Sequence, residues 1–401
     1  QRPALSVKHA LEAPRRDPGR VVLPPASYVH EKEKVEKRWP AAVKFIKERG
    51  LNEFVSGDIG DVGVILQGGM YNGVMRALQG LGLADVWGTS RIPLYVLNVT
   101  YPLVPDEVAE FCRNKRAVLL VEEGQPDFIE QALAKILRQA DIGTPLSGKD
   151  LFPMAGEYTA QVMGDAIGAF VRRWIPDVLA PSVRASNSAP ALEEKHARAL
   201  AEVVPPRPPG FCTGCPERPI FAAMKLVERE LGPHHVAADI GCHLFSIMPP
   251  FNIGTTTMGY GLGPASASAF NVKAAKRSIA VMGDGGFWHN GLTSGIGNAV
   301  FNKSDGVVLI VDNHYSAATG GQDLLSSRAA NRSRSTRHAI TEAVKGMGVG
   351  WVRQIDRTYD VGRVRDTLKE ALTTDQAGPK VIVASLGCML NRQRRERSLF
   401  A

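Results

Sequence analysis

The sequence has few cysteines, few aromatic residues and no long apolar run. Only five cysteines occur in 401 residues, and aromatic residues make up 7%. No stretch of about 18 apolar residues is present, which excludes a membrane-spanning helix. Gln1 is not followed by a charged and then apolar leader, so we expect no secretion signal and a cytoplasmic location. In that compartment thiols stay reduced, which argues against a domain held together by disulfides.

A nucleic-acid-binding module is also missing. The chain carries 48 Lys and Arg against 40 Asp and Glu, a formal net charge of +8. A nucleic-acid-binding protein would concentrate such an excess in a basic stripe on a recognisable module. Here the densest basic run comes near the end, at Arg392, Arg394, Arg395 and Arg397. We interpret it as a solvated linker, although a basic face could still steer an acidic protein partner.

The composition that is present is typical of a globular protein. Apolar residues make up 44% and charged residues 22%, and the length predicts two or three domains. The pattern along the chain divides it into four segments: 1–54, a linker and a charged helix; 55–145, an α/β domain; 146–210, a helical connector and proline-rich linker; and 211–396, a second α/β domain.

Both central domains alternate short apolar runs with amphipathic stretches, a pattern typical of parallel α/β sheets. In the first, strands are predicted at 64–66, 94–97 and 118–121, with helices near 70–80, after 105 and at 127–138. In the second, strands are predicted at 236–240, 279–282, 307–311, 351–355 and 381–384. Its predicted helices are 216–231, 260–270, 291–302, 339–347 and 361–372. Further helices are predicted at 157–173 and 191–203.

Polar residues follow two consecutive strands of the second domain. Gly283-Asp284-Gly285 comes directly after the strand at 279–282, and Asn313 follows the strand at 307–311. A right-handed β-α-β unit brings both turns to one edge of the sheet. A carboxylate and an amide oxygen are ligands that Mg²⁺ prefers, completed by phosphate oxygens and water. The two glycines let backbone approach a diphosphate, and the next helix offers its N-terminus to the charge.

A lone Gly-Asp-Gly is a common tight turn, but this spacing is more specific. The run from Gly283 to Asn313, with Thr319-Gly320-Gly321-Gln322 beyond it, resembles the thiamine diphosphate-binding motif. That resemblance implies Mg²⁺ held by the side chains of Asp284 and Asn313 and by the carbonyl of Tyr315. In one departure, this chain has Asp312 where many family members have Asn.

Four cysteines lie around the same predicted edge. Cys212 and Cys215 precede the helix at 216–231, whereas Cys242 and Cys388 follow strands. Four thiolates can hold a structural Zn²⁺ or an iron–sulfur cluster, and their residue types do not separate these from unlinked buried thiols. Cys112 lies in a helical pattern and is interpreted as a small core residue.

Several motifs occur in an order that resembles the 2-oxoacid:ferredoxin oxidoreductases. They are Phe211-Cys212-Thr213-Gly214-Cys215-Pro216-Glu217-Arg218, Asp239-Ile240-Gly241-Cys242, the Gly-Asp-Gly unit, Asn313 and Cys388. Within that family, 211–218 most resembles the alpha subunits of the indolepyruvate:ferredoxin oxidoreductases. The segment 62–140, with Thr100-Tyr101-Pro102-Leu103, is similar to the transketolase-C-terminal-like domain that precedes the thiamine domain there.

The resemblance implies oxidative decarboxylation of a 2-oxo acid, an aryl pyruvate such as indolepyruvate, to an acyl-CoA. It implies thiamine diphosphate, Mg²⁺ and a 4Fe-4S cluster on Cys212, Cys215, Cys242 and Cys388, with coenzyme A as co-substrate. Electrons would pass to ferredoxin, and the partner in a hetero-oligomer would be a small beta subunit. The family's pyrimidine-binding domain, which carries the activating glutamate, is expected before residue 1, and a ferredoxin-like cluster domain after Arg397.

The implied cofactor-binding residues extend beyond the metal ligands. They are Ile240, Gly241, Gly259, Gly283, Asp284, Gly285, Asn313, Tyr315 and Thr319. His243 and His289 are the histidines nearest these motifs and the candidates for contacting substrate, although each could equally be a structural histidine bonded to backbone. Two alternatives stay open: a non-oxidative thiamine diphosphate-dependent decarboxylase or carboligase, and a non-catalytic domain with a structural zinc site.

Overall fold

The computed structural model describes residues 18–179, 199–204, 208–270 and 276–395. Cα packing divides the chain into two units, Gln1–Val204 and Pro205–Ala401, and each is described by itself. The division falls at the proline-rich stretch where the sequence predicts a linker. Among the helices of these described ranges, none combines the length and the apolar character needed to cross a bilayer.

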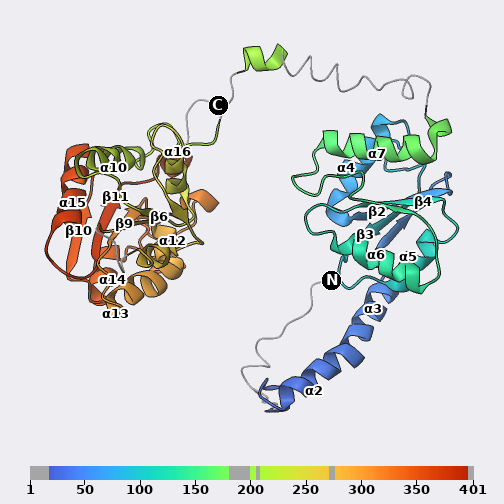
Figure 1. Cartoon of the computed structure of the whole chain (residues 1–401), viewed down its shortest axis with the longest axis horizontal. Coiled ribbons are helices and arrows are strands. Elements are labelled where there is room, and N and C mark those ends of the chain that lie inside the picture. Colours follow the sequence, from blue (N-terminus) through green and yellow to red (C-terminus); the bar gives the residue numbers. More distant parts are fainter. Residues whose placement is uncertain (1–17, 180–198, 205–207, 271–275, 396–401) are drawn as a thin grey trace. The chain divides into compact units, whose positions relative to one another are not determined.

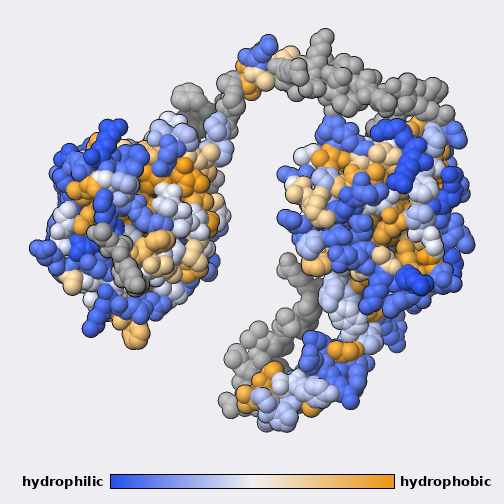
Figure 2. Space-filling view, in the orientation of Figure 1, coloured by the Kyte–Doolittle hydropathy of each residue, from blue (hydrophilic) through white to orange (hydrophobic). Residues whose placement is uncertain are grey.

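The first unit begins with a helical segment that extends further upstream than predicted. It comprises α2 (Ala26–Glu33), a π-helical stretch η2 (Lys34–Arg38) and α3 (Trp39–Glu48). Only Ile46 is buried along these three elements. Val22, just before this segment, and Tyr28, in its first helix, are exposed. Figure 2 shows hydrophobic residues in orange among hydrophilic ones in blue on the surface of the chain. Residues 1–17 of the predicted linker lie outside the described residues.

A five-stranded sheet forms the centre of the first unit, in the order β1-β3-β2-β4-β5. Its strands are β1 (Glu53–Val55), β2 (Val62–Gln67), β3 (Leu94–Leu97), β4 (Ala117–Val121) and β5 (Leu146–Ser147). All neighbours are parallel except the edge pair β1 and β3. The predicted parallel α/β architecture is therefore confirmed.

Helices cover both faces of this sheet (Figure 1). They are α4 (Tyr71–Gly80), α5 (Pro105–Cys112), α6 (Phe128–Gln139) and α7 (Ala160–Trp174). Because successive strand residues point to opposite faces, one set of buried side chains packs with α4 and α7 and the other with α5 and α6. Within the segment predicted as a helical connector, 146–210, α7 buries Met163 and Phe170 in the core of the first unit. Of the helix predicted at 191–203, residues 199–203 are helical and 191–198 lie outside the described residues.

The second unit has a six-stranded sheet in the order β10-β11-β9-β8-β6-β7, and all neighbouring strands are parallel. The strands are β6 (Val236–Ala238), β7 (Thr256–Thr257), β8 (Ile279–Gly283), β9 (Val307–Asp312), β10 (Trp351–Ile355) and β11 (Lys380–Ser385). The five predicted strands are present, and β7 is a short strand that the sequence pattern did not indicate.

Helices again cover both faces of the sheet (Figure 1). They are α10 (Arg218–Leu231), α11 (Gly263–Ser268), α12 (Asp284–Gly286), α13 (Asn298–Phe301), α14 (Ile340–Gly346), α15 (Val361–Thr373) and α16 (Met389–Arg395). α10 and α15 pack with one apolar face, whereas α11 and α14 pack with the other. The helix predicted at 291–302 begins earlier, because α12 continues through the π-helical η6 (Phe287–Gly297) into α13. Asp284 is thus the first residue of a helix and not part of a preceding turn.

Candidate functional site

The carboxyl ends of four adjacent strands bring the predicted site residues together. In the parallel order β11-β9-β8-β6, all these ends lie at one edge of the sheet. Asp239 follows β6, Asp284 follows β8 and Asn313 follows β9. Ser385 ends β11 shortly before Cys388. Asp284 and Asn313, which the sequence predicts at one sheet edge, thus follow two adjacent strands of this sheet.

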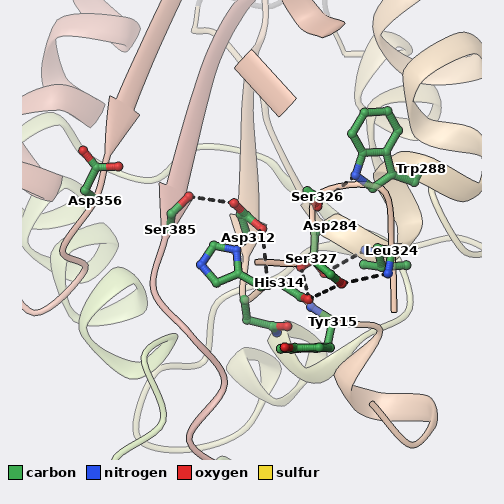
Figure 3. A network of polar contacts seen from close by, with 12 residues as sticks. Asp284, Trp288, Asp312, His314, Tyr315, Leu324, Ser326, Ser327, Asp356 and Ser385 are labelled. Carbon is green, nitrogen blue, oxygen red and sulfur yellow. Dashed lines mark hydrogen bonds and ion pairs between the residues drawn. The ribbon is translucent and has the colours of Figure 1, made fainter. Parts of the chain in front are cut away.

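Asp284 is a buried carboxylate whose oxygens both accept backbone hydrogen bonds. Oδ1 accepts from the Gly285 N–H at 2.8 Å and Oδ2 from the Tyr315 N–H at 3.1 Å, and Figure 3 shows the second contact. Burial and the neighbouring charge of Asp312 raise the pKa of Asp284 well above its usual value. A divalent cation at this position would offset the cost of keeping this carboxylate ionised.

Asp312, the last residue of β9, makes polar contacts with Ser385 and His314 (Figure 3). Its Oδ2 accepts from the Ser385 hydroxyl at 2.8 Å, and its Oδ1 lies 3.1 Å from His314 Nδ1. Burial alone would raise the pKa of Asp312, but the contacts with His314 and Ser385 lower it on balance. His314 has φ +70°, a strained value for a residue with a side chain, and its carbonyl accepts from the Ser327 hydroxyl.

Asn313 points to a different partner, although it directly follows Asp312. Its Nδ2 donates to Oε1 of Glu217 at 3.2 Å, and both side chains are buried. Asn313 Oδ1 and Glu217 Oε2 have no hydrogen-bond partner among the described residues. Burial raises the pKa of Glu217, although the charge of His243 and the Asn313 hydrogen bond oppose that rise.

A cavity of about 310 Å³ opens over these residues. This volume lies at the lower end of the range for small-molecule sites. The walls contain eight of the nine residues implied as cofactor-binding: Ile240, Gly241, Gly283, Asp284, Gly285, Asn313, Tyr315 and Thr319. Gly259 is not in the wall; its carbonyl accepts from the Leu262 N–H.

Asp239 organises one wall of this cavity from a fully buried position. Its Oδ2 accepts from the Gly261 N–H at 2.7 Å, and its Oδ1 lies 2.5 Å from His243 Nε2. Burial lowers the pKa of His243, but Asp239 and the charge of Glu217 raise it above the usual value on balance. His243 is therefore held in place by a carboxylate and also lines the cavity.

The loop after β9 forms another wall of the larger cavity. The Tyr260 hydroxyl lies 2.8 Å from Ser316 Oγ, which is 2.9 Å from Thr319 Oγ1. Thr319 in turn donates to the Gln322 side-chain carbonyl at 2.7 Å. These contacts hold a loop that the sequence marks only by its Thr-Gly-Gly-Gln run.

The four predicted cysteines line a second, smaller cavity of about 60 Å³. Glu217, Cys242, Asn313 and Ala317 belong to the walls of both cavities. A backbone hydrogen bond also connects the walls of the two cavities, since the Cys388 N–H donates to the Asn313 carbonyl at 3.2 Å. Burial raises the pKa of Cys215 and of Cys242 to about 12, so without a metal both remain thiols at neutral pH.

The cysteines surround this cavity but do not converge on one point. Within the described ranges, no group of three or more His, Cys, Asp or Glu is placed to hold a single metal ion. A tetrahedral zinc with bonds of about 2.3 Å requires sulfur atoms about 3.8 Å apart. The arrangement therefore does not match a preformed zinc site.

The structure separates the two candidate histidines. His243 lines the larger cavity, whereas His289 is exposed, outside its wall, and packs 5.3 Å from the Tyr260 ring. Sequence reasoning did not assign roles to Glu217 or Asp239. Both belong to quoted motifs, and the strand-end rule applied to β6 could have identified Asp239.

Comparison with known proteins agrees with this geometry. Residues 239–384 match the family described as the C-terminal, thiamine pyrophosphate-binding domain of thiamine pyrophosphate enzymes. Indolepyruvate oxidoreductase subunit IorA of Methanothermobacter thermautotrophicus is 28% identical over 391 residues, which cover 94% of this chain and 57% of that protein. The same subunit of Thermococcus kodakarensis is 29% identical, over 84% of this chain and 51% of that protein.

The chain thus spans about half the length of these curated relatives. A solved 2-oxoglutarate:ferredoxin oxidoreductase from Magnetococcus marinus, with 2-oxoglutarate, coenzyme A and succinyl-CoA bound, aligns with 45% of this chain and 65% of its own. Its TM-score is 0.38 and its identity 20%. Residues 239–384 thus match a thiamine pyrophosphate-binding domain, and the chain is similar over most of its length to the IorA subunits of indolepyruvate oxidoreductase.

Proposed function

We propose that this chain is the cofactor-binding part of the catalytic subunit of a 2-oxoacid:ferredoxin oxidoreductase. The whole enzyme would oxidatively decarboxylate a 2-oxo acid, an aryl pyruvate such as indolepyruvate, to an acyl-CoA and reduce ferredoxin. One observation carries the proposal: the cofactor cavity and the cysteine cavity adjoin and share Glu217, Cys242, Asn313 and Ala317. An oxidative enzyme needs an electron acceptor beside its carbanion-stabilising cofactor, and a non-oxidative carboligase does not.

Thiamine diphosphate, when bound, supplies an electron sink for decarboxylation. In this proposal Asp284 and Asn313, with the Tyr315 carbonyl, hold Mg²⁺ and through it the diphosphate. The donor set fits, because a buried carboxylate and a buried amide oxygen without a partner lie in one cavity wall. Ile240, Gly241, Gly283, Gly285 and Thr319 line the space around the cofactor, and Gly259 supports it from outside the wall.

We assign the four cysteines to a 4Fe-4S cluster. They line one cavity that adjoins the proposed cofactor cavity, where a cluster would be placed to take up electrons. Binding would require deprotonation of Cys215 and Cys242, whose raised pKa values mean that metal and proton compete.

His243 is the better of the two candidates for contact with substrate. It lines the cavity and is held by Asp239, whereas His289 lies outside the wall. We propose that His243 offers a hydrogen bond or a proton to the reacting group. We also propose coenzyme A as co-substrate, ferredoxin as acceptor and a small beta subunit as partner, as the resemblance of the motifs implies.

Calorimetry with thiamine diphosphate and Mg²⁺ tests the site directly. We expect saturable binding to the wild-type chain and loss of most affinity in Asp284→Ala. Asp356→Ala is the matched control, because Asp356 is exposed just beyond the end of β10 in the same sheet (Figure 3). Equal binding by both variants, or none by the wild type, would refute the proposed site.

Analysis of iron and acid-labile sulfide in anaerobically purified protein separates the oxidative enzyme from its alternatives. We expect about four of each per chain, as a 4Fe-4S cluster requires. Thiamine binding without iron would instead indicate a non-oxidative decarboxylase or carboligase. Zinc without thiamine binding would indicate a structural domain.

A further inference from the structure

The side-chain amide of Asn313 can adopt two orientations that differ by a flip of its oxygen and nitrogen. A carboxamide presents an oxygen on one side and an NH₂ group on the other, and the two orientations have nearly the same shape. Only the oxygen can bind a cation, whereas the NH₂ group would repel it. For the residue following β9 to act as a ligand, something must select which end faces the cofactor cavity.

Glu217 is placed to make that selection. Its Oε1 lies 3.2 Å from Asn313 Nδ2, and the side chains of Glu217 and Asn313 are 2% and 7% exposed. Oε1 accepts from the amide nitrogen, and a flipped carboxamide would instead turn its own acceptor oxygen toward this acceptor. The remaining atom, Asn313 Oδ1, is buried without a partner among the described residues. A buried acceptor left unpaired is costly unless a ligand uses it.

The backbone around Glu217 keeps it from moving away. Glu217 precedes α10 directly, and the carbonyl of Pro216 accepts from the Thr358 hydroxyl at 2.7 Å. On the other side, the Cys215 N–H donates to the Cys212 carbonyl at 3.1 Å and closes the cysteine turn. The carboxylate therefore enters the shared wall from a fixed point, 96 residues away from Asn313 in sequence.

We propose that Glu217 is a positioning residue that fixes the Asn313 carboxamide with its oxygen toward the metal. The inference rests on the proposed function, since it assumes that Asn313 is a metal ligand. Through this contact, the segment that carries two cysteines also sets the geometry of the divalent cation site. Removal of a group that orients a metal ligand typically lowers metal affinity by about 10- to 100-fold.

The test measures Mn²⁺ binding by electron paramagnetic resonance, in the presence of thiamine diphosphate, to the full chain. Glu217→Met removes the acceptor and keeps most of the volume, so we expect affinity to fall by about tenfold or more. Glu217→Gln can still accept from Asn313 but also permits the flipped amide, so it should lose no more than a few-fold. Glu228→Gln, on the same helix α10, is the matched control and should bind like the wild type.

The same substitution in an Asn313→Asp variant shows whether Glu217 acts by orienting the amide or by packing or charge. In Asn313→Asp, both ends of the side chain are oxygens, so orientation no longer matters. Adding Glu217→Met to Asn313→Asp should then cause no further loss of affinity, because no carboxamide is left to orient. Glu217→Gln keeps the shape of the side chain and still tests the role where Glu217→Met folds poorly.

Each result has one reading. An equal loss from Glu217→Met in both backgrounds, or no loss with Asn313 intact, overturns the positioning role while leaving the metal site in place. Failure of the wild-type chain to bind Mn²⁺ with thiamine diphosphate overturns the proposed function and, with it, this inference. A loss confined to the Asn313 background supports the role.

Discussion

Substitution of Gly261 by alanine tests whether the cofactor wall is built by close backbone approach. Gly261 has φ +80°, and a Cβ there would lie 2.4 Å from the carbonyl oxygen of Gly286 and 2.8 Å from the nitrogen of Gly291. The left-handed conformation costs an alanine about 1–2 kcal/mol, and overpacking against backbone adds about 1–3 kcal/mol. Alanine also lowers the conformational entropy of the unfolded chain, which offsets about 0.4–1 kcal/mol of this loss in stability. We expect a net loss of about 1–5 kcal/mol in the free energy of unfolding of the second unit.

Two glycines of the same unit serve as controls. Gly378 has φ +92° and nothing within 4 Å of its Cβ position, so Gly378→Ala carries the strain without the collision. We expect a loss of about 1 kcal/mol or less there. Gly346 ends α14, has no positive φ and has nothing within 4 Å, so Gly346→Ala should be neutral or stabilise by up to about 1 kcal/mol.

The assay must report on one unit, because a chain of two units need not unfold in a single step. Hydrogen exchange of peptides from β8 and β9, followed by mass spectrometry across a urea series, gives the opening free energy of the second sheet. If Gly261→Ala destabilises these strands no more than Gly378→Ala does, the close approach of the 261 and 286 backbones is wrong. The wall would then have another origin.

Three further predictions follow from the core and the two cavities. Cys242→Ser should lower iron per chain under anaerobic purification, whereas Cys112→Ser, buried in the first unit, should leave iron unchanged. The pKa of His243 is raised above its usual 6.5, so the protonated side chain stabilises the fold. This stabilisation should be complete below pH 6.5 and lost as pH rises through the raised pKa. In urea unfolding of the second unit, His243→Gln should therefore remove this dependence of the free energy of unfolding on pH. Phe170→Ala should cost about 3–5 kcal/mol in urea unfolding of the first unit if α7 belongs to its core, and Phe128→Ala, which is exposed, under about 0.5 kcal/mol.

The central strands of both units could be predicted because burial on both faces gives continuous apolar runs. The prediction at 94–97 coincides with β3, and that at 307–311 falls within β9, where every residue is buried. The strands that were missed, β1, β5 and β7, have two or three residues each, too few to form a pattern. The amphipathic helix α7 was predicted close to its true bounds, but periodicity does not say which sheet a helix covers.

Some residues of the candidate site could be predicted from the sequence and others could not. Residues at strand ends could be predicted, because the topology of a parallel sheet fixes the edge to which they belong. The role of Glu217 could not, since a buried charged residue has no periodic signal and its role depends on a partner far away in sequence. Glu217 meets Asn313 across 96 positions, and only the packed structure shows that contact.

The end of β9 shows how neighbouring residues can serve opposite purposes at one sheet edge. Successive side chains of a strand alternate between faces, so Asp312 binds Ser385 on β11 while Asn313 meets Glu217 on the other side. The chain then turns through His314 at φ +70°, a conformation that costs about 1–2 kcal/mol for a residue with a side chain. That turn lets the Tyr315 N–H reach Asp284, and the Asp312–His314 contact offsets part of its cost. Asp312 thus stabilises the bend that joins the ends of β8 and β9 through its contacts with Ser385 and His314.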